Sequence, residues 1–380
     1  MGFHFIPKDT KIDFVGMRRF SYVFSIFILL AGLASLFLKG GPIYGIDFAG
    51  GAVVQVYFNQ PISDEEVKKS MEKSSLPNIV VQQFGEDDRG YLLRLADYEG
   101  AQSLRIRAAV EQALAEGMPG VKYEIQRLEM VGPKVGADLR AGAVEALFYA
   151  TLLISVYLSG RFEQRWTAAL LMTFVLVGGI SGGVYILEFL GLSLNRGFLI
   201  LAAAFLAALF CWKLKLAFAL GAMASIVHDL LISIGVFSIL DKEFDLTIIA
   251  ALLTVVGYSL NDTIIVFDRI RENLRNNAVR KEGLAAVINR SVNQTLSRTI
   301  LTSATTMLVV LALLVLGGGI IHDFALLLCV GILVGTYSSI FVASPVLLFF
   351  EKNISYQVAR EQDEAAKEAV RKRNRRLPQV

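Results

Sequence analysis

The sequence predicts a polytopic α-helical membrane protein with about eight spans and one folded domain outside the bilayer. Of the 380 residues, 54% are hydrophobic and only 19% are charged, whereas soluble domains carry about 25% charged residues. Apolar runs recur along the chain, and about 20 such residues cross a bilayer as a helix. A single long polar segment, at about 39–139, interrupts these runs.

Eight apolar windows are long enough to span a membrane. They lie at about 18–38, 141–159, 166–187, 197–212, 216–239, 247–267, 299–318 and 324–349. The first is longer than the core of a signal peptide and has no clear cleavage site, so we expect it to remain as a span. Both cysteines, Cys211 and Cys329, fall in apolar runs, so no disulfide framework is expected outside the membrane.

Basic residues in the short loops predict the orientation, because Lys and Arg accumulate on the cytoplasmic side. They follow the second, fourth and sixth spans: Arg161 and Arg165, Lys213 and Lys215, and a group of arginines between 269 and 298. The alternate loops are nearly empty of Lys and Arg. Both termini are therefore predicted to lie in the cytoplasm. The basic cluster Arg371–Arg376 of the tail is predicted to contact anionic lipid.

The segment 39–139 is predicted to fold as a ferredoxin-like βαββαβ domain. Its patterns predict strands at 52–58, 79–84, 90–95 and 121–128, and helices at 63–73 and 101–116. Ser63 followed by Glu66 is a capping box, and Gly117 is predicted as a helix C-cap. No nucleophile–base pair, metal cluster or phosphate-binding loop occurs in this sequence segment. It is interpreted as a binding or force-bearing module, not an enzyme.

Asp262 is the most informative residue, because it lies inside the apolar run 248–267. A carboxylate at that depth costs about 2.5–3.5 kcal/mol on insertion scales, so by default it marks an ion or substrate path. Tyr258 and Ser259 precede it by about one helical turn, and Asn261 adjoins it. The preceding span carries a second deep pair, His228 and Asp229.

The seventh span begins with a polar stripe that is predicted to point into the helix bundle. Arg298, Thr302 and Thr305 follow each other at helical spacing, and Gln294 and Ser291 continue this face backwards. Arg298 is expected to reach the depth of Asp262 and to hold its charged form, which protonation would release. Asp262, Arg298, Asn261 and Thr302 are therefore predicted to form a proton relay. Asn261 and the threonines are equally compatible with simple hydrogen bonding between helices, and His228 with a satisfied core histidine.

Two long motifs resemble the SecF family. GYSLNDTIIVFDRIREN spans 257–273, and NRSVNQTLSRTILTSATT spans 289–306. GIDFAGG at 45–51, with Gly45, Asp47, Gly50 and Gly51, lies just outside the first span, and VGP at 131–133 precedes the second. The likeness extends over nearly the whole chain.

The resemblance implies the smaller half of the SecDF complex, which is related to RND transporters and forms an RND-like half-bundle. It implies a protein of the bacterial inner membrane that works with SecD, the SecYEG channel and the accessory protein YajC on translocating preprotein. It also implies use of the proton-motive force, with protons as the coupling ion and no cofactor. The family assigns proton passage to the residues matching Asp262 and Arg298, and leaves the role of the HD pair less settled.

The chain departs from the family's six spans by a predicted inserted hairpin at 163–214. The predicted layout is a cytoplasmic N-terminus 1–17, a first helix 18–38, an outer domain 39–139, a second helix 140–162, the hairpin, a helical core 215–350 with a cytoplasmic loop 268–298, and a basic tail 351–380. Because the hairpin adds two crossings and no deep charge, we expect it to lie at the periphery.

Three alternative functions are compatible with parts of the sequence. An RND-related exporter of small molecules or lipids would share the fold, although such exporters usually carry both halves in one chain. A passive scaffold for the translocon would use the polar residues structurally. An intramembrane aspartyl protease is disfavoured, because the aspartates stand in HD and ND, without the YD and GxGD motifs. No pattern indicates nucleic-acid binding.

Overall fold

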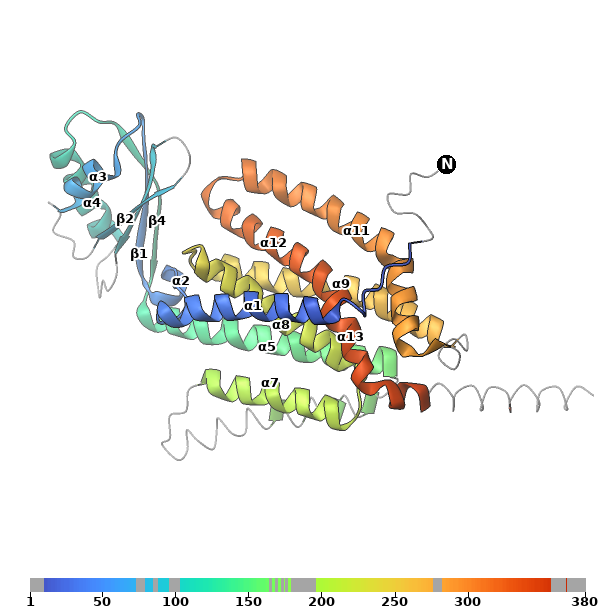
Figure 1. Ribbon diagram of the computed structural model, residues 1–380. Helices are drawn as coiled ribbons and strands as arrows, with labels where there is room; N and C mark the ends of the chain where they lie inside the picture. The colour runs from blue at the N-terminus through green and yellow to red at the C-terminus, as the bar shows by residue number, and fades with distance from the viewer. Residues whose placement is uncertain are drawn as a thin grey trace, which may run out of the picture.

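The computed structural model describes most of the chain. The described residues are 10–72, 79–84, 88–95, 103–163, 196–275 and 282–356, together with Lys367 and isolated positions between 166 and 178. Within them, a bundle of long helices carries one small domain at its end (Figure 1).

Six helices of the described residues are long and apolar enough to cross a membrane. They are α1 (Arg18–Leu38), α5 (Pro133–Glu163), α8 (Ala217–Ile239), α9 (Leu246–Arg275), α11 (Leu284–Leu316) and the helical run Ile321–Tyr356 that begins in α12 (Gly318–Ser338). Each overlaps one of the predicted windows. α1 turns large side chains such as Phe20 and Phe37, which are 73% and 87% exposed, away from the bundle, as a lipid-facing helix must.

The predicted hairpin 163–214 is described only in its second half. α7 (Arg196–Lys213) corresponds to the predicted span 197–212 and packs at the edge of the bundle beside α5 and α8 (Figure 1). The first predicted span of the hairpin, 166–187, lies almost entirely outside the described residues.

The connection predicted as a loop at 268–298 is mostly helical. α9 continues to Arg275, and α11 begins at Leu284. Both helices therefore extend beyond the apolar windows on which the prediction was based. Arg161 at the end of α5 bonds Asp268 at 2.9 Å on this side of the bundle.

The long helical run changes its winding directly after Ser338. A π-helical turn, η1 (Ser339–Ala343), is followed by α13 (Ser344–Val346) and a 3₁₀ turn, η2 (Leu347–Phe350). Pro345 has no N–H and cannot continue the α-helical bonds. The Ser344 hydroxyl instead donates to the Ser339 carbonyl at 2.8 Å.

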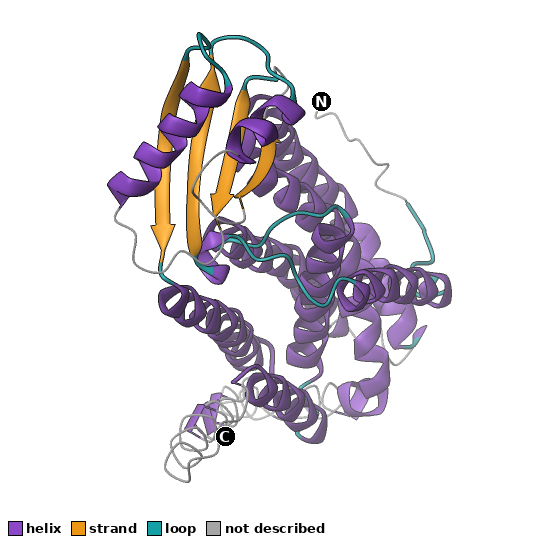
Figure 2. Ribbon diagram, turned by 90° about the vertical axis from the view of Figure 1, so that its left-hand side faces the viewer, coloured by secondary structure: helices purple, strands orange, loops and turns teal. Residues whose placement is uncertain are grey.

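The outer domain contains four strands and two main helices in the order strand, helix, strand, strand, helix, strand. These are β1 (Gly51–Phe58), α3 (Asp64–Glu72), β2 (Ile79–Phe84), β3 (Gly90–Leu95), α4 (Ser103–Gly117) and β4 (Tyr123–Val131). The sheet order is β2-β3-β1-β4, and all neighbouring strands are antiparallel. The helices of this domain lie on one face of the sheet (Figure 2), and alternate residues of β1 are fully buried.

The two helix-end predictions in this domain had different outcomes. The capping box is confirmed, since the amide of Glu66 donates to the Ser63 hydroxyl at 3.4 Å and that of Ser63 to the Glu66 carboxylate at 3.3 Å. Gly117 is the last residue of α4, as predicted, but it does not have the positive φ of a left-handed helix cap. A Cβ there would lie 2.2 Å from the Ser70 hydroxyl, so Gly117 permits close packing of α3 against α4.

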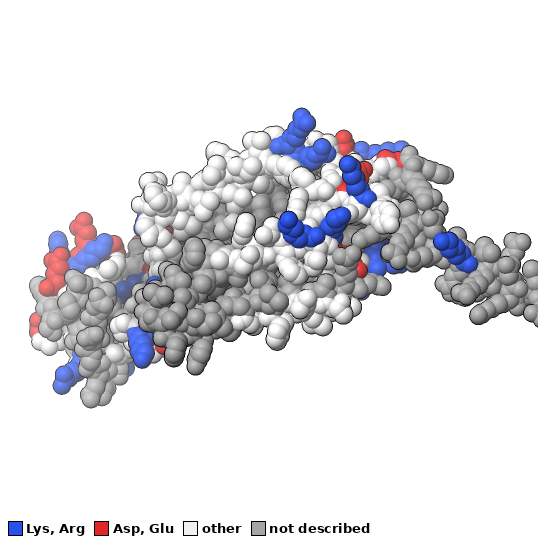
Figure 3. Space-filling model, turned by 90° about the horizontal axis from the view of Figure 1, so that it is seen from below, with Lys and Arg blue, Asp and Glu red and all other residues white. Residues whose placement is uncertain are grey.

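Few charged side chains of the described residues lie on the outer surface of the bundle near its middle. In the view from below, Lys and Arg of the described residues gather towards the end away from the outer domain (Figure 3). This distribution is the one expected of a chain whose helices cross a bilayer.

Candidate functional site: two carboxylates inside the helix bundle

Two aspartates on neighbouring helices lie inside the bundle. Asp229 on α8 is 1% exposed, and Asp262 on α9 is 0% exposed. The helices bring both predicted residues to the interior, where a carboxylate needs hydrogen-bond donors to replace water. The donors that each carboxylate finds differ greatly.

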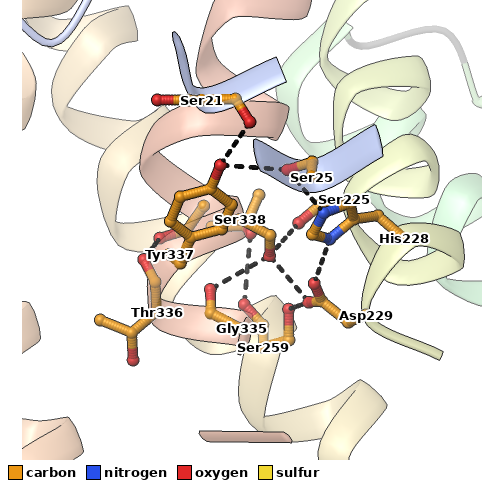
Figure 4. A network of polar contacts seen from close by, with 12 residues as sticks. Ser21, Ser25, Ser225, His228, Asp229, Ser259, Gly335, Thr336, Tyr337 and Ser338 are labelled. Atoms are coloured by element: carbon orange, nitrogen blue, oxygen red, sulfur yellow. Dashed lines mark hydrogen bonds and ion pairs between the residues drawn. The ribbon is translucent and has the colours of Figure 1, made fainter. Parts of the chain in front are cut away.

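Asp229 is surrounded by donors from three helices (Figure 4). One carboxylate oxygen, Oδ2, accepts from the hydroxyl of Ser259 on α9 at 2.5 Å and from that of Ser338 on α12 at 2.8 Å. The other, Oδ1, lies 2.9 Å from Nδ1 of His228. Ser225, one turn earlier on α8, contacts the Ser338 hydroxyl at 2.8 Å. All of these groups are buried.

His228 extends this network to α1. Its Nε2 lies 3.0 Å from the Ser25 hydroxyl, which lies 3.0 Å from the phenolic oxygen of Tyr337. Tyr337 donates to the main-chain carbonyl of Ser21 at 2.7 Å, and its ring stacks on the imidazole with centroids 6.1 Å apart. His228 is thus part of a polar network that joins four helices.

Asp262 has only one hydrogen bond among the described residues. Its Oδ2 accepts from the hydroxyl of Ser303 on α11 at 3.2 Å, and its buried Oδ1 has no partner there. Ser303 also contacts the Thr336 hydroxyl of α12 at 2.7 Å. Asp262 therefore retains acceptor capacity for a proton or a further donor.

Arg298 does not pair with Asp262 in this structure. It lies exposed on α11, with no hydrogen bond or ion pair to Asp262. The predicted stripe points inward only at its start, where Ser291 and Gln294 accept hydrogen bonds from Asn273 of α9 at 2.8 and 2.9 Å. Among the described residues, Thr302 and Thr305 bond only to carbonyls of their own helix, from 2.9 to 3.1 Å. Asn261, the last member proposed for the relay, is also exposed.

A different row of polar residues on α11 faces the bundle. Like the predicted stripe it includes Ser291, but from there its members follow at intervals of four residues. Its members are Ser291, Thr295, Thr299 and Ser303, all of them buried. Sequence reasoning missed Ser303 and Thr336, as it missed Ser21, Ser25, Tyr337 and Ser338 of the Asp229 network. The polar run GTYSS at 335–339 was the available signal for three of these six.

The remaining predicted residues of α9 have separate positions. Ser259 belongs to the Asp229 network, although it lies less than one turn from Asp262. The hydroxyl of Tyr258 is buried and has no partner among the described residues. Within this part of the chain, no three His, Cys, Asp or Glu side chains are grouped so that they could hold a metal ion.

The motif at 45–51 forms the junction between the outer domain and the bundle. The Gly45 amide donates to the Phe244 carbonyl at 2.8 Å, and Asp47 accepts from the Leu246 amide at the start of α9 at 3.0 Å. Gly50 has φ +80°, and a Cβ there would lie 2.8 Å from Cα of Pro133. Gly51 pairs with Val131, so the two ends of the domain leave it side by side.

Acidic groups gather at this junction. Burial raises the pKa of Asp245, the amide of Ile248 opposes the rise by donating to its carboxylate, and the neighbouring carboxylates of Asp47 and Asp323 add to it. Arg94 of β3 forms an ion pair with Glu243, and Lys242 bonds Asp323 at 2.7 Å. The start of α9, the helix of Asp262, is thereby fixed to the base of the outer domain.

Comparison with known proteins identifies the family. Residues 110–200 and 190–353 match the family model of the protein export membrane protein SecD/SecF, C-terminal. The protein translocase subunit SecF of Magnetococcus marinus is 40% identical over 359 residues, covering 93% of this chain and 96% of the relative. The chain belongs to the SecF family.

Further relatives agree with this assignment. The SecF protein of Vibrio alginolyticus is 36% identical over 91% of this chain and 92% of its own length. The crystal structure of SecDF from Thermus thermophilus, a translocon-associated membrane protein, superimposes with a TM-score of 0.65 at 30% identity. This match covers 91% of the present chain but only 40% of that SecDF chain. The SecF-family chain is accordingly a multi-pass membrane protein.

Proposed function

We propose that the chain uses proton movement through its membrane helices to drive late steps of polypeptide translocation across the bacterial inner membrane. The observation that carries this proposal is Asp262, which is fully enclosed and has one carboxylate oxygen without a partner among the described residues. A carboxylate that is enclosed in this way changes its protonation state and its partners together. Asp262 is the proton-carrying group, and Arg298 is the cation that holds its ionised form.

The exposed position of Arg298 fits a missing second half. Arg298, Thr302 and Asn261 lie on surfaces that this chain alone leaves open. The structural relative, which carries SecDF in one chain, is much longer than this chain. We place SecD against this surface, where it would enclose Arg298 and direct its guanidinium towards Asp262.

The remaining parts of the assembly follow from the family. The SecYEG channel delivers the preprotein, YajC is an accessory partner, and both termini of this chain lie in the cytoplasm. The outer domain is of ferredoxin-like type and holds emerging polypeptide on the periplasmic side. The segment 163–214 adds a peripheral hairpin that brings the number of spans to eight.

The energy available limits the mechanism. One proton crossing 100 mV supplies about 2.3 kcal/mol, which biases a two-state element by about 50-fold but does not switch it fully. Several protons per displacement, or a ratchet that retains each step, are required. The outer domain moves in such steps because α9 is fixed to its base through Asp47.

The test is potential-dependent export from vesicles that contain this chain with SecD and SecYEG. Asp262→Asn should abolish the part of preprotein export that an ionophore removes, because an amide cannot carry the proton. Arg298→Lys should reduce it less than Arg298→Ala. Asp268→Asn, on the same helix but in a surface ion pair with Arg161, is the matched control and should leave it unchanged.

Two results would contradict the proposal. If Asp262→Asn exported as well as the parent chain with the same ionophore sensitivity, the residue would carry no proton. If export were never sensitive to the potential in any variant, the chain would be a passive scaffold.

A further inference from the structure

A chain of four polar contacts links Asp229 to the main chain of α1 (Figure 4). It runs from Asp229 Oδ1 to His228 Nδ1 at 2.9 Å, from Nε2 to Ser25 Oγ at 3.0 Å, from there to Tyr337 at 3.0 Å, and from Tyr337 to the Ser21 carbonyl at 2.7 Å. The proposed function gives this chain no role.

The direction of each hydrogen bond follows from its last contact. A main-chain carbonyl only accepts, so the single phenolic hydrogen of Tyr337 points to Ser21. The Ser25–Tyr337 contact then takes its hydrogen from Ser25, which has only one. Nε2 of His228 must therefore carry a hydrogen and donate it to Ser25.

The contact between His228 and Asp229 requires a second hydrogen. It lies on Nδ1, which makes an imidazolium facing a carboxylate, or on Oδ1, which makes a neutral imidazole facing a carboxylic acid. In both forms the pair holds two hydrogens and has no net charge. The other oxygen, Oδ2, needs none, because it accepts from Ser259 and Ser338.

The surroundings favour the same hydrogen count. In the apolar parts of the helices that contact the pair, the titratable groups are Tyr22 on α1, Tyr258 and Asp262 on α9, and Cys329 and Tyr337 on α12. Among the described residues, no Lys or Arg is hydrogen-bonded or ion-paired with Asp229 or His228. An ionised Asp229 beside a neutral imidazole would be a buried charge without a counter-ion, which the membrane interior disfavours.

We infer that His228 and Asp229 form a second proton-binding site whose occupancy determines whether α1 is joined to Tyr337 of α12 by two hydrogen bonds or by one. Release of one proton to water leaves Asp229 ionised and one hydrogen on Nδ1, so that Nε2 becomes an acceptor. Ser25 then turns its hydrogen from Tyr337 to Nε2. No hydrogen remains for the Ser25–Tyr337 contact, since Tyr337 still donates to Ser21.

The loss of this contact acts on the helix that leads to the outer domain. α1 ends at Leu38, and the chain continues through Gly40 and Gly41, both at positive φ, to the junction motif at 45–51. The outer half of α1 stays on α8 through Ser35, whose hydroxyl contacts Ser238 at 2.9 Å. Proton release therefore removes one of the two hydrogen bonds that join the inner half of α1 to Tyr337, while the bond from Tyr337 to Ser21 and the Ser35 contact of the outer half remain.

The hydrogen count can be measured directly. The chain has three histidines, so His4→Gln with His322→Gln leaves His228 alone for ¹⁵N solid-state NMR of the full chain in lipid vesicles at pH 7. The site is supported if the His228 ring carries two hydrogens. It is also supported if the ring carries one hydrogen, on Nε2, and the infrared spectrum shows a carboxylic-acid band that Asp229→Asn removes. One ring hydrogen without such a band overturns it.

Variants test the link to α1. Tyr337→Phe removes the acceptor of the Ser25 hydrogen, which is then free to donate to Nε2, so the proton affinity of the pair should fall about three- to tenfold. Ser35→Ala, a matched loss of one α1–α8 contact, should leave the NMR titration unchanged. Equal effects of the two variants would overturn the coupling. The readout does not depend on Asp262 carrying protons, so failure of the proposed function would not mask the result.

Discussion

Asp229 and Asp262 are both buried in the same helix bundle, yet their carboxylates are held in different ways. Asp229 has three contacts to its two oxygens, from α8, α9 and α12. Asp262 has one, from Ser303 at 3.2 Å, and leaves an oxygen without a partner among the described residues.

The difference separates a structural requirement from a functional one. Removing a saturated carboxylate leaves several buried donors unpaired, which is expensive in a low-dielectric interior. Removing a carboxylate with few hydrogen bonds leaves few donors unpaired. Asp229 should therefore contribute more to stability, whereas Asp262 is freer to exchange partners during a transport cycle.

Asp229→Ala should have the largest effect on folding. It leaves the hydroxyls of Ser259 and Ser338 and the ring of His228 without their acceptor, and removal of one partner of a buried charged pair typically costs about 3–5 kcal/mol. Asp262→Ala removes one hydrogen bond and should cost about 1 kcal/mol or less. The measurement is the free energy of unfolding by steric trapping in lipid bicelles.

Asp229→Asn is the control for shape, and should recover part of the loss because an amide oxygen still accepts. Equal destabilisation by Asp229→Ala and Asp262→Ala would show that hydrogen-bond saturation does not distinguish the two sites.

Displacing α1 should weaken the Asp229 network without changing a polar residue. Gly32 and Gly235 allow α1 and α8 to cross closely, and a Cβ on Gly235 would lie 2.8 Å from Cα of Gly32. Gly235→Ala should therefore destabilise the bundle by about 1–3 kcal/mol and separate Ser25 from His228. Altered ¹⁵N shifts of His228 would report that separation.

Gly257→Ala is the matched control, since a Cβ there meets nothing within 4 Å. Alanine in a helix is favoured over glycine by about 1 kcal/mol, so this variant should be neutral or stabilising. Similar losses in the two variants would contradict the role of close α1–α8 packing.

Much of the fold could be predicted, because its determinants are local. Six of the eight apolar windows correspond to long helices, and the strand predicted at 52–58 corresponds to β1. Gly117 shows where local reasoning fails. A glycine is needed at this position because Ser70 of another helix approaches it closely. The sequence next to Gly117 does not reveal that contact.

The candidate site was only partly predictable for a similar reason. A carboxylate in an apolar run is conspicuous, so Asp229 and Asp262 were found. Their partners are serines and threonines, which also occur on lipid-facing surfaces by bonding to their own helix, as Thr302 and Thr305 do. α11 carries polar residues on two faces, and only the packing against α9 and α12 determines that the face of Ser303 is buried.

Ser303→Ala and Thr302→Ala test which face of α11 is inside. Ser303 donates to Asp262 and contacts Thr336, so its loss should cost about 1 kcal/mol. Among the described residues, Thr302 bonds only within its helix, so its loss should change the free energy of unfolding by less than about 0.5 kcal/mol. The reverse order, measured on the chain without SecD, would place the predicted stripe inside after all.

The smallest effect is expected at the junction with the outer domain, where burial raises the pKa of Asp245. A raised folded-state pKa means that the folded protein binds the proton more tightly than the unfolded chain. The stability that Asp245 contributes is then present below its unfolded pKa and is lost as pH rises through its folded pKa. The unfolding midpoint of the parent chain should therefore fall relative to that of Asp245→Asn across this interval. A difference that stayed constant with pH, or increased as pH rises, would mean that ionised Asp245 is stabilised more by the Ile248 amide, 2.8 Å away, than it is destabilised by burial beside Asp47.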